Sequence, residues 1–108
     1  LVFPDFCENV KIDDKNDMSE IIDILKKQKI NHKIPALLPE DTIIAHKTGE
    51  NSKVELDAGI IYSPACDYIL CISVTDFFGR EIHSTFAEIS RTVYYYFNRQ
   101  HQLSVIFF

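Results

Sequence analysis

Three short runs of β-branched and apolar residues follow one another in the chain, separated only by short polar turns. They cover residues 42–48, 54–62 and 68–75, and the gaps between them hold Gly, Asn, Ser and Pro, which favour turns. Strands joined so closely must pair antiparallel, because a parallel crossover needs roughly a dozen residues or more. The sequence therefore predicts a three-stranded antiparallel meander.

The alternation of residue types predicts which faces of these strands are buried. In residues 54–62 two series of positions alternate, as they do in a strand with one buried face. The apolar series is Val54, Leu56, Ala58 and Ile60, and the opposite series is Glu55, Asp57, Gly59 and Ile61. Residues 68–75 are apolar almost throughout, which predicts burial on both faces.

Two helices are predicted to flank the strands. The first carries apolar residues at helical spacing, namely Met18, Ile21, Ile22 and Leu25. Asp17 and Glu20 fit a capping box at its start, and it should end near residues 29–31. Pro35 and Pro39 then favour an extended connector over residues 34–40. A longer helix that packs on one sheet face is marked by Ile82, Phe86, Ile89, Val93 and Phe97.

The resulting fold class is α+β, with the order helix, three strands, helix. A chain of 108 residues, 46% of them hydrophobic, is long enough for one domain with one modest core. Residues 1–16 lack a sustained period and are expected to be an irregular N-terminal segment, followed by the α+β unit over residues 17–108. Residues 103–108 are apolar enough for a further strand.

The net charge of the chain and the spacing of its cysteines and histidines argue against several functions. A formal net charge of −5 disfavours nucleic-acid binding, which needs clustered Lys and Arg. No apolar run approaches the roughly 18 residues that span a bilayer. The three cysteines lack C-x-x-C spacing, so buried free thiols are expected rather than a disulfide framework. The four histidines are scattered without a paired motif, so neither a metal site nor a cofactor is expected.

Lys47-Thr48-Gly49, at the end of the first strand, stands in an ordered context of further motifs. These motifs are Leu25-Lys26-Lys27-Gln28, Ile34-Pro35-Ala36-Leu37-Leu38-Pro39, and Asp57-Ala58-Gly59-Ile60, followed by the final helix. With these landmarks, residues 18–97 resemble the C-terminal part of the class A β-lactamase-like serine hydrolases, in the penicillin-recognising superfamily. Taken alone, the tripeptide is more readily explained by an ordinary strand end that opens into a turn.

The resemblance implies a role for each residue of the tripeptide and for its neighbour. Lys47 would offer a fixed positive charge to a substrate carboxylate, and the Thr48 hydroxyl would bond the same group. Gly49 would let a planar acyl substrate lie against the strand. The backbone N–H of Glu50 would be one of two oxyanion-hole donors. The implied partner is a small acyl substrate, a β-lactam or a related amide or ester, and the implied setting is bacterial, extracytoplasmic and part of an antibiotic response.

Two neighbouring residues are expected to be structural rather than catalytic. Asp57 reads as a strand carboxylate that faces water or pairs with a lysine across the hairpin. His46 should point to the opposite sheet face from Lys47, as a packing or supporting residue.

The chain also departs from the family pattern. A carboxylate at Glu50 would repel the carboxylate of a β-lactam unless the side chain points away. None of the seven serines has Lys three residues on, and Ser-Asp-Asn is absent. The isolated chain should therefore be inert, and a non-catalytic binding or structural module is the alternative function. By the same resemblance, the segment should leave a sheet edge and face exposed and self-associate through them.

Overall fold

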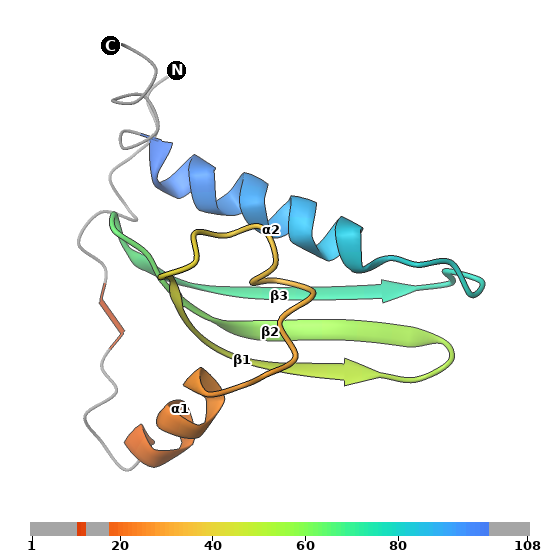
Figure 1. Cartoon of the computed structure of the whole chain (residues 1–108), viewed down its shortest axis with the longest axis horizontal. Helices are drawn as coiled ribbons and strands as arrows, with labels where there is room; N and C mark the ends of the chain where they lie inside the picture. The colour runs from red at the N-terminus through yellow and green to blue at the C-terminus, as the bar shows by residue number, and fades with distance from the viewer. Residues whose placement is uncertain (1–10, 13–17, 100–108) are drawn as a thin grey trace.

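The computed structural model describes residues 11–12 and 18–99, and its elements occur in the order expected (Figure 1). Helix α1 spans Ser19–Lys26 and helix α2 spans His83–Phe97. Between them lie the strands β1 (Ile43–Glu50), β2 (Val54–Tyr62) and β3 (Asp67–Thr75). The predicted α+β class is confirmed. The expected irregular stretch and the expected last strand fall almost entirely outside the described residues.

The three strands form one antiparallel sheet in the order β1-β2-β3, so the predicted meander is confirmed. The register pairs Thr48 with Asp57 and Glu50 with Glu55, and the hairpin closes with Asn51 N donating to Val54 O at 2.9 Å. Gly59 lies opposite His46. A Cβ at Gly59 would come within 2.5 Å of His46 Cβ, so only glycine lets the two strands approach this closely.

The sheet has two unlike faces, and their polarity is the reverse of the one predicted for β2. The core face carries Ile44, His46, Thr48 and Glu50 of β1 with their partners Ile61, Gly59, Asp57 and Glu55. On this face Asp57 is fully buried. The other face, called here the open face, carries the apolar series of β2, where Leu56 is 39% exposed. The carboxylates rather than the alternating apolar residues therefore point inward.

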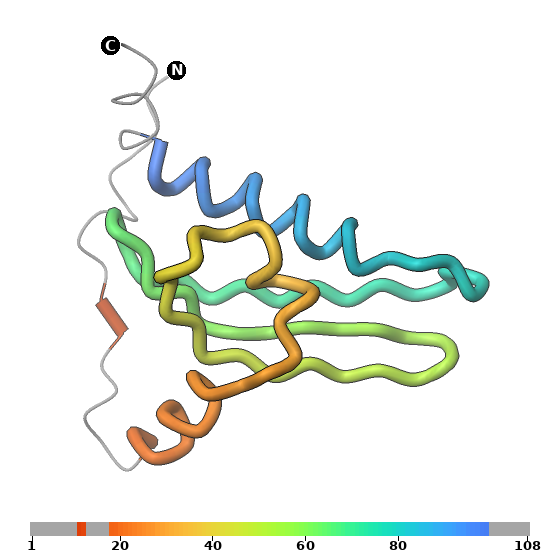
Figure 2. Tube along the Cα trace, viewed as in Figure 1, coloured from red at the N-terminus to blue at the C-terminus, as the bar shows by residue number. Residues whose placement is uncertain are grey.

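The core face is covered by α2 together with the connector between α1 and β1, which crosses the sheet in Figure 2. Ile34 and Leu38 of the connector and Phe86 and Tyr94 of α2 join the sheet residues in one apolar cluster. Ser90 Oγ donates to Ile34 O at 2.8 Å and so ties the helix to the connector. The predicted position of the long helix on one sheet face agrees with this packing.

Helix α1 is shorter than predicted and lacks the expected cap. It ends at Lys26, and its N-cap is Met18, with no side-chain cap hydrogen bond. Asp17 lies outside the described residues. The helix lies against β1, and Lys26 Nζ is 4.7 Å from the centre of the Tyr62 ring on the open face. Neither described helix is long and apolar enough to cross a membrane.

Three further expectations are wrong. The connector over residues 34–40 is not extended but winds through turns, in which Leu38 N donates to Pro35 O at 3.1 Å. β3 is not buried on both faces, since Ile69 on the open face is 68% exposed. Cys66 is disulfide-bonded rather than a free thiol. Cys71 is free, as expected, but it is exposed instead of buried.

Candidate active-site edge

Within the described residues β1 is an edge strand, and one side of its backbone has no partner strand. Hydrogen-bonded and non-hydrogen-bonded pairs alternate along an antiparallel ladder. Asn51 and Val54 form a hydrogen-bonded pair, so the alternate residues Gly49 and Lys47 also bond to β2. The residues between them, Glu50 and Thr48, direct their backbone groups to the free edge. The N–H of Glu50 therefore faces away from β2, toward the edge of β1 that no described strand pairs with.

The side chains of the tripeptide do not gather in one pocket within this chain. Lys47 and Thr48 are neighbours in a strand, so they emerge on opposite faces, with Lys47 exposed and Thr48 only 7% exposed. Lys47 Nζ donates to Thr48 O at 2.6 Å, a carbonyl that the register directs to the free edge. Lys47 and Thr48 thus flank the edge from its two sides.

The Glu50 side chain is held on the core face and away from the edge. Its Oε1 lies 3.2 Å from Lys33 Nζ and 3.7 Å from His32 Nε2. The Lys33 side chain is fully buried, and its Nζ also donates to Leu56 O at 3.4 Å. The hydrogen bond and charge of Lys33 lower the pKa of Glu50. No motif pointed to this pair, because residues 33 and 50 lie in different segments.

Asp57 and His46 form a buried network behind the tripeptide. Asp57 Oδ1 is 2.9 Å from His46 Nδ1, and Asp57 Oδ2 accepts a hydrogen bond from Ile34 N at 3.0 Å. His46 Nε2 lies 3.0 Å from Asn31 Oδ1. The expected exposed position of Asp57, or its pairing with a lysine across the hairpin, is therefore wrong. The packing or supporting role expected for His46 agrees with these contacts, which fix the connector onto the hairpin.

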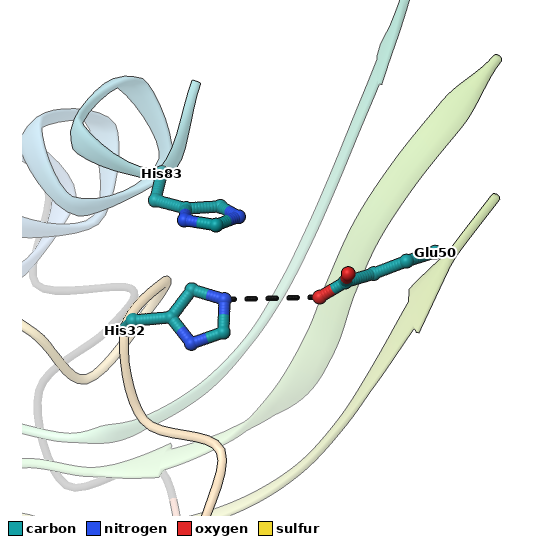
Figure 3. Close-up of side chains that lie close together, drawn as sticks. All are labelled: His32, Glu50 and His83. Carbon is teal, nitrogen blue, oxygen red and sulfur yellow. Dashed lines mark ion pairs between the residues drawn. The ribbon is translucent and has the colours of Figure 1, made fainter. Parts of the chain in front are cut away.

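Two histidines that are far apart in sequence meet beside Glu50 (Figure 3). The ring centres of His32 and His83 are 4.0 Å apart. One donor atom from each of His32, His83 and Glu50 lies within 4.8 Å of the others. Sequence reasoning expected no metal site, since positions 32, 50 and 83 follow no ligand spacing, and only the packing of α2 and the connector brings them together.

The chain is similar to a known enzyme family and to several solved structures. Residues 8–97 match the family model described as the β-lactamase enzyme family. The TLA-1 extended-spectrum β-lactamase, solved as a variant, is 25% identical with a TM-score of 0.69, over 76% of this chain. PBP-A, solved as a variant in an acyl-enzyme complex with penicillin G, is 30% identical with a TM-score of 0.67, over 75% of this chain.

A class A β-lactamase from Bacteroides cellulosilyticus adds support for the fold alone, at 24% identity and a TM-score of 0.66 over 70% of this chain. The match covers 34% of the TLA-1 chain and 31% of each of the other two, so this chain spans about a third of their length. No curated protein matches the sequence.

Proposed function

The chain belongs to the β-lactamase enzyme family, and from that premise we propose that β1 forms the substrate-binding wall of a serine hydrolase active site. Lys47 and Thr48 bind the carboxylate of a small acyl substrate, a β-lactam or a related amide or ester. Gly49 leaves room for that substrate, and the N–H of Glu50 donates to the oxyanion. In this proposal residues 17–108 are the C-terminal part of the hydrolase domain, and residues 1–16 are an irregular segment before it.

One observation carries the proposal: the backbone of Glu50 is directed to a free sheet edge that Lys47 and Thr48 flank. An oxyanion-hole donor must have no partner within its own sheet, so that it can meet charge that develops on the substrate. An N–H that is hydrogen-bonded within the β1–β2 ladder could not act as an oxyanion-hole donor. A substrate carboxylate near this edge would be within reach of a lysine on one side and a threonine on the other.

The contacts of Glu50 also answer the electrostatic objection to a carboxylate at this position. Its negative charge is paired with Lys33 at 3.2 Å and lies on the core face. Repulsion of an incoming carboxylate is weakened both by this pairing and by the side chain pointing away from the edge. The site therefore accommodates an anionic substrate.

The setting and partners of the protein are part of the same proposal. We expect an extracytoplasmic location in a bacterium and a role in the response to β-lactam antibiotics. The disulfide at Cys66 agrees with an oxidising compartment. Nucleic acid is not expected as a partner at a net charge of −5. The exposed apolar residues of the open face and the free edge of β1 favour self-association.

A second candidate is a non-catalytic binding or structural module that keeps this half of the fold. The observation that favours it is the lack of Lys three residues after any serine of the 108-residue chain. For either candidate, we expect the 108-residue chain alone to leave a chromogenic cephalosporin unchanged, because it supplies no nucleophile of this type. Turnover with an acyl-enzyme burst would contradict that expectation.

The test of the hydrolase uses Glu50→Pro and the matched control Glu50→Gln in the protein expressed from its complete gene. Proline removes the N–H but is tolerated on an edge strand where that N–H faces outward. We expect Glu50→Pro to lower the rate of acylation by fluorescent penicillin about 10²–10³-fold, and Glu50→Gln to change it only a few-fold. Circular dichroism verifies that both variants fold.

Equal acylation of both variants would refute the oxyanion role of Glu50. If the unmodified protein is acylated neither by penicillins nor by activated esters, the hydrolase itself is refuted and the non-catalytic module takes its place.

A further inference from the structure

The cluster of His32, Glu50 and His83 has the composition and spacing of a metal site, and we propose that it binds a divalent transition-metal ion of the zinc type. The three side chains come from three segments: the connector, the end of β1 and the first residue of α2 (Figure 3). Their candidate donor atoms all lie within 4.8 Å of one another. The cluster shares Glu50 with the proposed hydrolase site but uses its carboxylate rather than its backbone N–H, so its ability to bind an ion does not depend on the hydrolase proposal.

The distances fit an ion after small side-chain movements. Ligand atoms on a tetrahedral zinc ion, at about 2.0–2.2 Å from the metal, lie about 3.3–3.6 Å from each other. His32 Nε2 is already 3.7 Å from Glu50 Oε1. The side chains of His32, His83 and Glu50 are 43%, 35% and 45% exposed, so they can close by the remaining distance and an ion can enter from solvent.

The donor set selects the class of ion. Two imidazoles and one carboxylate are the His₂Glu set that binds zinc with a fourth position open to water. Calcium and magnesium prefer all-oxygen sites, so two imidazole ligands disfavour them. Among the first-row divalent ions, nickel and copper can also bind such ligands, and cobalt serves as a coloured substitute for zinc in the experiment.

Carboxylates around His83 provide the support that metal-bound histidines require. Glu55 Oε1 lies 3.2 Å from His83 Nε2, and Glu81 Oε1 lies 3.4 Å from His83 Nδ1. Whichever nitrogen binds the ion, the other keeps a carboxylate partner. Such a partner fixes the tautomer and orientation of the ring and strengthens the ligand.

Two positive charges near the cluster disfavour binding of a cation. Lys33 Nζ lies 3.2 Å from the same Glu50 oxygen, and the N-terminal end of α2 carries a partial positive charge at His83. When an ion takes this oxygen, Lys33 Nζ retains two other contacts. It donates to Leu56 O and lies 5.3 Å from the centre of the Phe86 ring. The carboxylates beside His83 offset the charge of the helix end. We therefore expect a reversible site rather than a tightly held structural ion.

The experiment titrates the metal-free 108-residue chain with Zn²⁺ by calorimetry and with Co²⁺ by visible absorption. We expect one ion per chain, absorption bands of tetrahedral cobalt, and a melting temperature that rises as zinc is added. His32→Ala, His83→Ala and Glu50→Gln should each weaken binding at least about tenfold, because they remove direct ligands. Two controls, Glu40→Gln and Glu88→Gln, remove exposed carboxylates outside the cluster and should leave the affinity unchanged.

The proposal is overturned if zinc binds no better than magnesium, or if the His32 and His83 variants bind it as well as the unmodified chain. It is equally overturned if the control variants lose as much affinity as the cluster variants, since the ion would then sit elsewhere. The ligand positions are exposed or half-exposed, so these substitutions should leave the fold intact, and circular dichroism of each variant verifies this.

Discussion

Removing the carboxylate of Asp57 should be among the most damaging changes a single side chain can undergo in this protein. Asp57→Ala leaves two buried donors without acceptors: the Nδ1 side of His46, 2.9 Å from Asp57 Oδ1, and the N–H of Ile34, 3.0 Å from Asp57 Oδ2. Each orphaned donor costs about 1–3 kcal/mol, and loss of one partner from a buried charged network costs about 3–5 kcal/mol. We therefore expect a loss of about 4 kcal/mol of unfolding free energy.

The assay is urea denaturation followed by circular dichroism. With a slope of about 1–3 kcal/mol/M, such a loss lowers the unfolding midpoint by about 2 M. Asp57→Asn keeps one acceptor and turns an NH₂ group toward the other donor, so its loss should be smaller, about 1–3 kcal/mol. Asp41→Ala removes an exposed carboxylate and should stay within about 0.5 kcal/mol of the unmodified protein.

A double-mutant cycle separates the network from simple loss of volume. If His46 and Asp57 act together, Asp57→Ala should cost less in a chain that already carries His46→Ala, with a coupling of about 1 kcal/mol or more. The reasoning is refuted if Asp57→Ala costs less than about 1 kcal/mol, or if the two substitutions are additive.

Three further outcomes follow from the structure. Gly59→Ala should destabilise the fold by about 1–3 kcal/mol, because its Cβ would clash with backbone and Cβ atoms of β1, whereas Gly49→Ala would touch only a movable side chain and should cost less; thermal melts compare them. Lys33 lowers the pKa of Glu50 below its ordinary value of 4.5, so the ionised carboxylate stabilises the fold fully above that pH. This stabilisation is lost as the pH falls through the folded pKa, and Glu50→Gln should flatten that part of an acid-denaturation profile. Burial raises the pKa of Tyr68, so its contribution to the free energy of unfolding is complete below about pH 10 and declines above it as the unfolded chain ionises. The stability of Tyr68→Phe, measured by denaturation at alkaline pH, should therefore fall less with rising pH.

The strands and helices were predictable because their signals are local. Turn residues bound each strand, and the observed β2 has the predicted ends. Which face of β2 is buried was not predictable, because the alternation of residues distinguishes two faces but does not say which of them is covered. Here Asp57 is buried because the connector supplies the N–H of Ile34, and Leu56 remains exposed because nothing described in this chain covers it.

The candidate site was predictable only in part, for the same reason. Lys47-Thr48-Gly49 is contiguous, so a family resemblance could mark it from the sequence. The partners of Glu50 could not be read in this way, since Lys33, His32 and His83 reach it from two other segments. Side chains that meet only through tertiary packing leave no spacing signal, and they include every candidate metal ligand found here.

Glu50 belongs to both proposals, and its carboxylate can be changed without its backbone N–H. Its backbone N–H faces the free edge, whereas its carboxylate lies on the core face with Lys33 and His32. Glu50→Pro removes the N–H together with the carboxylate, so it should impair both acylation and zinc binding. Glu50→Gln keeps the N–H and removes the charge, so it should weaken zinc binding and change acylation only a few-fold. If instead Glu50→Gln loses acylation as completely as Glu50→Pro does, a shift of the whole end of β1 is the simpler cause, and neither assignment to Glu50 holds.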